Sequence, residues 1–89
     1  MIVKWTKTAL FSLEEIAQYI AEDNIVRAKT FVQELRDKTN NLKQFPSLGK
    51  SGRVFGTREL VIHKNYIVIY RIKAKAVEII RIHHTSMKL

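Results

Sequence analysis

The chain has 89 residues but no cysteine, a single proline and only three glycines. The absence of cysteine excludes a disulfide framework and a thiolate metal site, and it fits a reducing cytoplasm. Long apolar runs are missing as well, because the longest, over residues 66–70, is far too short to cross a bilayer. The composition therefore predicts one small cytoplasmic domain over residues 1–89, with no membrane association.

Motifs for cofactors and metals are also absent. Gly49, Gly52 and Gly56 form neither GxxxxGK[ST] nor GxGxxG, the glycine patterns that cradle phosphates. His83 and His84 are neighbours, so a strand would place them on opposite faces, where they cannot easily bind one ion. We therefore expect no cofactor and no metal site.

Acidic residues are scarce in the second half of the chain. Over residues 45–89, nine lysines and arginines stand against only Glu59 and Glu78, whereas residues 1–44 carry seven basic and six acidic side chains. Most of the net charge of +8 therefore lies in the C-terminal half. Clustered cations attract phosphates and carboxylates, so we expect a polyanionic or acidic partner. The alternative is a basic surface that is simply solvated.

The first half predicts a strand and two amphipathic helices. A short strand near residues 2–5 precedes Thr6, whose hydroxyl suits the N-cap of a helix that runs to about residue 22. Asp23 and Asn24 are both good caps for a second helix over residues 25–43, and the short turn favours an antiparallel helical hairpin. The predicted core stripes contain Leu10, Leu13, Ile16, Ala17 and Ile20 in the first helix, and Ala28, Phe31, Val32, Leu35 and Leu42 in the second.

The second half predicts a β-meander. Pro46 ends the second helix, a glycine-containing loop follows, and three β-rich runs cover residues 58–63, 66–72 and 77–83. Short turns join these runs, so the strands are antiparallel. Adding the first strand gives an antiparallel sheet with the helical hairpin on one face, an α+β fold. Because the strands are apolar on both faces, we expect the second face to meet the curled sheet itself, another copy or a partner.

One group of side chains offers chemistry. Arg58, Arg71, Arg81, His83 and His84 could support RNA cleavage, because histidine exchanges protons near neutral pH and arginine holds phosphate through paired hydrogen bonds. Such cleavage needs a base, an acid and cations around one phosphate. The alternative is structural, with histidines at strand ends and arginines against carboxylates. Arg81 lies among isoleucines, so we expect an acid of this chain or of another to pair with it.

Four stretches of the sequence share one known pattern. They are W-T-x-x-A-x-x-x-L-x-x-I-x-x-Y-I-A-x-D-N over residues 5–24, F-P-x-x-G-K-x-G-R-V-x-G-T-R-E-L-V over residues 45–61, Y-I-V-x-Y-R-I over residues 66–72 and V-E-I-I-R-I-x-H over residues 77–84. In order, spacing and residue choice they resemble the RelE/ParE superfamily of bacterial toxins from type II toxin–antitoxin systems. The resemblance covers essentially the whole chain, and it implies a helical hairpin packed on a small antiparallel sheet.

The resemblance also implies a partner. A cognate antitoxin, acidic in its toxin-binding segment, would wrap the basic sheet, neutralise it and fold on binding, giving a toxin–antitoxin hetero-oligomer. The residues expected to bind the antitoxin or the target are Arg53, Arg58, Arg71, Lys73, Arg81 and Lys88.

The superfamily divides by target. ParE-like members poison DNA gyrase, whereas RelE-like members cleave mRNA in the ribosomal A site. The segments GTRELV and YIVIYRI resemble the ParE branch. In addition, Leu60, Ile62 and Ile67 occupy positions where the nuclease members tend to have basic residues. The basic residue expected near Met87 is displaced to Lys88. The resemblance therefore implies a gyrase inhibitor that blocks replication, not an enzyme.

Two alternatives stay open. The first is a ribosome-dependent mRNA endonuclease in which His83 or His84 is the acid or base, with Arg58 and Arg81 on the phosphate. The second is a degenerate toxin that acts only as an antitoxin-binding module.

Overall fold

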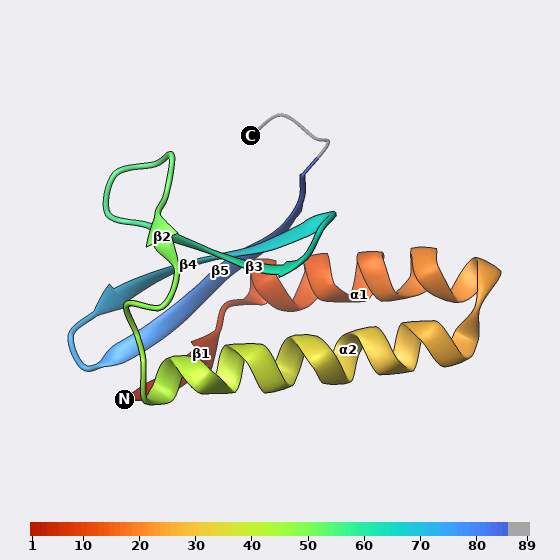
Figure 1. Cartoon of the computed structure of the whole chain (residues 1–89), viewed down its shortest axis with the longest axis horizontal. Coiled ribbons are helices and arrows are strands. Elements are labelled where there is room, and N and C mark those ends of the chain that lie inside the picture. The colour runs from red at the N-terminus through yellow and green to blue at the C-terminus, as the bar shows by residue number, and fades with distance from the viewer. Residues whose placement is uncertain (86–89) are drawn as a thin grey trace.

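Two helices cover one face of a five-stranded sheet in the computed structural model, which describes residues 1–85 (Figure 1). The sheet order is β1-β5-β4-β3-β2, so the predicted α+β layout is confirmed. The elements are β1 (Ile2–Trp5), α1 (Lys7–Asp23), α2 (Ile25–Asn40), the 3-10 turn η1 (Asn41–Lys43), β2 (Lys50–Ser51), β3 (Arg58–His63), β4 (Tyr66–Lys73) and β5 (Ala76–His84).

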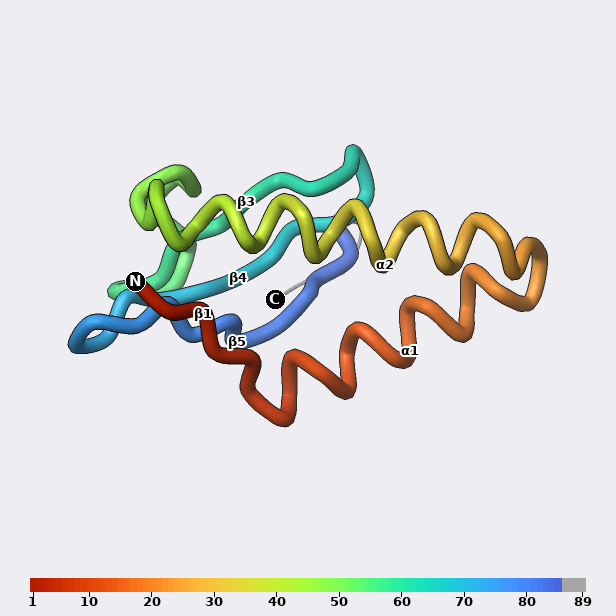
Figure 2. Tube along the Cα trace, turned by 90° about the horizontal axis from the view of Figure 1, so that it is seen from below, coloured from red at the N-terminus to blue at the C-terminus, as the bar shows by residue number. Residues whose placement is uncertain are grey.

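Two side-chain caps define the helical hairpin. The Thr6 hydroxyl accepts a hydrogen bond from the Ala9 N–H at 3.1 Å, as the sequence predicts. Of the two predicted caps of the second helix, Asp23 and Asn24, the structure uses Asn24, whose side chain accepts a hydrogen bond from the Arg27 N–H at 2.9 Å. Asn24 alone separates the helices, so they return antiparallel across the same face of the sheet (Figure 2). Among residues 1–85, no helix is both long enough and apolar enough to cross a membrane.

The core lies between this hairpin and the sheet. Leu13, Phe31 and Leu35 pack against strand residues that include Val68 and Ile79. The predicted stripe is wrong at Leu10, which is 49% exposed, whereas its neighbour Ala9 is wholly buried. The buried residues of α1 are Ala9 and Leu13, four residues apart, and Leu10 lies one residue on from Ala9, so its side chain points to the margin of the buried face. Leu42 is buried as expected, but it lies in η1 because α2 ends at Asn40.

The sheet departs from the prediction at its two edges. The meander β3–β4–β5 is antiparallel as expected, but β1 pairs with β5 in parallel, with Val3 opposite Val77. A tight turn forces the antiparallel direction only on strands that are neighbours in sequence, and both helices separate β1 from β5. At the other edge, the two-residue strand β2 pairs with the start of β3, and its shortness left no periodic signal.

The junction between β1 and α1 is fastened to β5. The Thr6 hydroxyl, which caps α1, lies 2.9 Å from the carbonyl oxygen of Ile79 and 3.2 Å from that of Ile80. At this point β5 carries a bulge, because Ile69 and Tyr70 pair with Arg81 and Ile79 and leave Ile80 as the extra residue. The Thr6 N–H also donates to the Ile79 carbonyl oxygen at 3.1 Å, so the backbone and the side chain of Thr6 both fasten this junction to β5.

Tyr70 connects the core to the loop before β2. Its side chain is fully buried, and its hydroxyl donates to the Pro46 carbonyl oxygen at 2.7 Å and accepts from the Gly49 N–H at 2.9 Å. Only glycine fits at position 49, because a Cβ there would lie 2.8 Å from the Tyr70 ring and 2.9 Å from the Glu59 carbonyl oxygen. The loop is therefore seated directly on the sheet.

The second face of the sheet is partly buried within the chain itself. On the side away from the helices, Ile67 and His83 are buried, whereas Val61 is 57% exposed. We call this side the open face. By the strand registers and the alternation of side chains, it carries Glu59, Val61, Ile67, Ile69, Arg71, Lys73, Glu78, Arg81 and His83.

Replacing Thr6 with valine should lower the free energy of unfolding by roughly 1–2 kcal/mol, because both the helix cap and the hydrogen bond to β5 are lost. Thr6→Ser keeps the hydroxyl and serves as the matched control, with a loss well below that of valine. Urea unfolding followed by circular dichroism measures both. Equal stability of the valine and serine variants would contradict the role of the hydroxyl.

Gly49→Ala should cost about 1–3 kcal/mol of unfolding free energy, because the methyl group would overpack against Tyr70 and the backbone of β3. The comparison is Gly56→Ala, where a Cβ meets nothing within 4 Å and only the positive φ of 83° opposes the change, at about 1 kcal/mol. Thermal and urea unfolding would give the two values. A Gly49→Ala protein that is no less stable than Gly56→Ala would show that the loop is not tightly seated.

Candidate functional site

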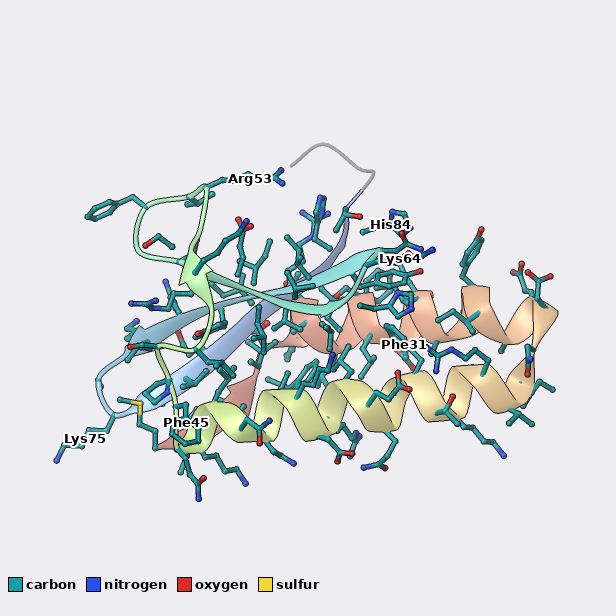
Figure 3. The ribbon with its side chains drawn as sticks, in the orientation of Figure 1. Phe31, Phe45, Arg53, Lys64, Lys75 and His84 are labelled. Carbon is teal, nitrogen blue, oxygen red and sulfur yellow. The ribbon has the colours of Figure 1, made fainter. Side chains whose placement is uncertain are left out.

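The open face gathers most of the predicted binding cations. Arg71, Lys73 and Arg81 are exposed there, and Arg53 extends over the same side from the loop between β2 and β3 (Figure 3). Lys88, also predicted to bind, lies outside the described residues. The structure therefore brings four of the six predicted residues to one side of the sheet.

Both acidic side chains of the C-terminal half are engaged within the chain. Arg71 Nε lies 2.6 Å from Glu78 Oε1, and this hydrogen bond, with Lys73 and other cations nearby, lowers the pKa of the Glu78 carboxyl. The Glu59 carboxylate is buried and accepts the Arg53 N–H at 3.0 Å. The internal acids therefore leave much of the positive charge of this face uncompensated.

Arg81 contributes to this uncompensated positive charge. The bulge at Ile80 sets it opposite Ile69 on the open face, at the edge of the sheet beyond the end of β1. Among residues 1–85, the ion pairs are Arg27 with Glu34 and Arg71 with Glu78, so no acid of the described part pairs with Arg81. The sequence predicted that an acid of this chain or of another chain pairs with Arg81. Within residues 1–85 no acid of this chain does so, which leaves an acid of another chain.

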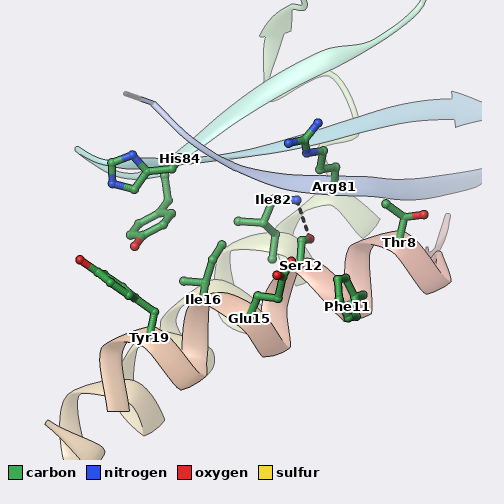
Figure 4. Close-up of a pocket in the computed structure, with 10 residues that line it drawn as sticks. Thr8, Phe11, Ser12, Glu15, Ile16, Tyr19, Arg81, Ile82 and His84 are labelled. Atoms are coloured by element: carbon green, nitrogen blue, oxygen red, sulfur yellow. Dashed lines mark hydrogen bonds between the residues drawn. The ribbon is translucent and has the colours of Figure 1, made fainter. Parts of the chain in front are cut away.

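A groove lies beside Arg81, between α1 and the second half of β5 (Figure 4). It exists because β1 ends at Trp5, so α1 and not a strand lies beside β5 from Ile80 onward. The Ile82 N–H donates to the Ser12 hydroxyl at 3.1 Å, which joins the two walls. The groove measures about 730 Å³ and is called the α1–β5 groove below. Its lining includes Phe11, Ile16, Tyr19, Tyr66, Ile82, Arg81 and His84.

The two predicted histidines lie on opposite faces. His84 packs edge-on against Tyr66 at the groove, with ring centroids 4.9 Å apart, and burial raises the pKa of the Tyr66 hydroxyl. His83 is buried and pairs with Ile67 on the open face. Their separation agrees with the alternation expected in a strand. Within residues 1–85, no three histidine, aspartate or glutamate side chains gather as a metal site would require.

Arg58 is apart from the other predicted residues. It pairs with Tyr70 in the strand register, so its side chain lies on the helix side of the sheet, away from Arg81. Its guanidinium donates to the Gly49 carbonyl oxygen at 2.7 Å and approaches that of Ser47 at 3.4 Å. The described structure therefore uses Arg58 to hold the loop before β2, and the predicted set of Arg58, Arg81, His83 and His84 is divided.

Sequence analysis missed the aromatic residues of the groove. Phe11 and Tyr19 are 61% and 67% exposed and lie eight residues apart on one side of α1, with Glu15 between them. Their signal was available, because both are large apolar residues that fall outside the core stripe of the helix. This signal alone did not predict a groove, because the groove depends on the end of β1 at Trp5, beside β5, and that pairing is set only in the folded chain.

Comparison with known proteins agrees with the fold. Residues 3–89 match the family described as ParE toxin of type II toxin-antitoxin system, parDE. Y4kP of Sinorhizobium fredii, named as a candidate toxin, is 37% identical over 87 residues, which cover 97% of this chain and 90% of that protein.

Two solved structures have the same arrangement. The chromosomal ParDE TA system from P. aeruginosa matches with a TM-score of 0.85 and 27% identity, covering 94% of this chain and 95% of that chain. The toxin–antitoxin complex RelBE2 from Mycobacterium tuberculosis matches with a TM-score of 0.59 and 25% identity, covering 93% and 95%. The sequence-based assignment is confirmed: the chain belongs to the ParE toxin family of type II toxin–antitoxin systems, within the ParE/RelE superfamily.

Proposed function

We propose that this toxin inhibits DNA gyrase and blocks replication until a cognate antitoxin neutralises it. The observation that carries the proposal is the division of the residues that RNA cleavage would need. His84 lies in the α1–β5 groove, His83 is buried on the opposite face, and Arg58 is engaged with carbonyl groups of the loop before β2.

Transfer of a phosphoryl group in RNA requires an acid, a base and cations within reach of one phosphate. Of the predicted set, only Arg81 and His84 border the same groove, so that set supplies one cation and one titrating group there. Inhibition of a large enzyme by binding requires shape and charge alone. The greater likeness to the ParDE structure than to RelBE2, with TM-scores of 0.85 and 0.59, supports the same choice.

The antitoxin is proposed to occupy the α1–β5 groove and the adjoining part of the open face around Arg81. The groove offers apolar walls from Phe11, Ile16 and Tyr19, and Arg81 stands where the groove meets the basic surface. An amphipathic segment with apolar anchors and an acidic side chain near Arg81 would match both features. The relatives described above include structures titled as toxin–antitoxin systems, which supports a partner of this kind.

Ribosome-dependent mRNA cleavage is the second candidate, favoured by one observation. Arg81, His84, Glu15 and Tyr19 line a common groove, so a cation and several proton-exchanging groups border one space. A degenerate toxin that only binds its antitoxin is the third, and it predicts no effect of the free chain on growth.

Induction of this chain alone should reduce thymidine incorporation within minutes while methionine incorporation continues, because gyrase inhibition stops replication before it stops protein synthesis. His84→Phe should keep this effect, since phenylalanine retains the ring contact with Tyr66 but exchanges no proton. Pulse labelling of bacterial cultures provides the measurement, with equal protein amounts checked by immunoblot. Methionine incorporation that fails first, together with loss of the effect in His84→Phe, would favour mRNA cleavage.

Arg81→Glu should weaken antitoxin binding by about ten-fold or more, because it replaces an attraction by a repulsion at the edge of the groove. Lys75→Glu changes the net charge equally at the exposed turn between β4 and β5, and it should weaken binding much less. Isothermal titration calorimetry at low and high salt gives both values. Equal losses in the two variants would show that only overall charge matters.

A further inference from the structure

The loop of residues 52–57, between β2 and β3, presents an exposed apolar tip. Phe55 is 103% exposed and Val54 is 62% exposed. A single exposed hydrophobic residue is ordinary on a protein surface. Two consecutive exposed hydrophobic residues at the end of a projecting loop are less common, and neither Val54 nor Phe55 belongs to the core of the chain.

This loop is held in one shape by its own hydrogen bonds. The Gly52 N–H donates to the Thr57 carbonyl oxygen at 2.8 Å, and the Thr57 N–H and hydroxyl both donate to the Val54 carbonyl oxygen, at 3.1 and 2.6 Å. Gly56 supplies the turn, with a φ of 83° that other residues rarely adopt. The tip is therefore ordered before any partner arrives, so binding through it loses little conformational entropy.

The base of the loop is tied to the sheet. The buried Glu59 carboxylate accepts the Arg53 N–H at 3.0 Å, and a Cβ at Gly52 would lie only 2.3 Å from the Thr57 hydroxyl oxygen. Glycine is thus required for the closure of the loop. Together with Glu59, it fixes the direction in which the tip projects from β3.

The loop and the α1–β5 groove lie at opposite edges of the sheet. The order β1-β5-β4-β3-β2 puts the groove at the β5 side and the loop at the β2 side, where it stands above the strands (Figure 1). A segment that folds in the groove does not need the tip. A projecting aromatic side chain instead needs a concave site, which a folded protein supplies in advance and an unfolded segment does not.

Charge favours a protein over a nucleic acid as the occupant. Residues 54–57 carry no charge, and the Arg53 side chain extends over the open face and not alongside the tip (Figure 3). A side chain that wedges between bases needs cations on the flanking phosphates. The uncharged tip lacks such cations, so an apolar pocket of a folded protein suits it better.

We propose that the 52–57 loop is the target-binding element of this toxin, with Phe55 inserted into a preformed apolar pocket of the folded protein that the toxin inhibits. This inference rests on the proposed function, because it requires that the toxin acts on a protein target, which we take to be gyrase. It assigns the target and the antitoxin to different edges of the sheet, so the two activities are separable by mutation.

The test is growth arrest after induction, measured for the wild type, Phe55→Ser and the matched control Val26→Ser, whose side chain is 70% exposed at the start of α2. Phe55→Ser should raise the amount of toxin needed for half-maximal arrest at least about ten-fold, as expected for an interface anchor. Val26→Ser should not change it, and Phe55→Trp should restore much of the activity. Thermal unfolding of all three variants should match the wild type, because the altered side chains lie outside the core.

A second measurement separates the target from the antitoxin. Purified Phe55→Ser should bind the cognate antitoxin with the dissociation constant of the wild type. Full arrest by Phe55→Ser, or a loss of antitoxin affinity in parallel with the loss of arrest, would overturn the proposal. So would a wild-type chain that never slows growth, since no target would then exist.

The identity of the target is tested apart from the loop. Purified gyrase and a duplex DNA oligonucleotide are the two probes, each titrated with wild type and Phe55→Ser. Weaker inhibition of gyrase by Phe55→Ser supports both proposals. Arrest that depends on Phe55 while gyrase is unaffected by the wild type would reject gyrase but keep the loop as the target-binding element. Binding to DNA that is lost in Phe55→Ser would overturn the choice of a protein pocket.

Discussion

The Tyr70 hydroxyl is the interaction on which the functional half of this chain depends. It lies in the core between the sheet and the helices, yet it donates to the Pro46 carbonyl oxygen and accepts from the Gly49 N–H. A buried hydroxyl without such partners would be costly, so sheet and loop stabilise each other. Arg58 adds a hydrogen bond to the Gly49 carbonyl oxygen. Strand β2 and the loop after it begin from this anchored segment.

The acidic side chains of the C-terminal half also have partners within the chain. Glu78 pairs with Arg71, and Glu59 is buried where it orders the loop that begins at Arg53. Both acids of the C-terminal half are therefore engaged within the chain, and neither pairs with Arg81. Arg81 is left at the meeting point of the basic open face and the apolar groove. A partner that is both acidic and amphipathic satisfies the two surfaces together, which is the chemistry expected of an antitoxin segment.

Much of the fold was predictable because the signals are local. Thr6 and Asn24 cap the helices that the apolar spacing predicts, and short turns make the meander antiparallel. The opposite placement of His83 and His84 follows from strand alternation alone. The parallel direction of β1, the exposure of Leu10 and the helix-side position of Arg58 were not predictable in this way. Each depends on what lies across the sheet or beside it.

By itself, the sequence determined the order of the helices and the longer strands, the Thr6 cap, the basic character of the C-terminal half and the family, because these reside in neighbouring residues, composition and motif spacing. Only the tertiary structure decided that β1 stops short of the second half of β5 and so opens a groove at Arg81. It also decided that the buried Glu59 carboxylate accepts the Arg53 N–H and so holds the loop that presents Phe55. The physical reason is that burial and pairing are properties of residues far apart in sequence, and they are set only when the whole chain has packed.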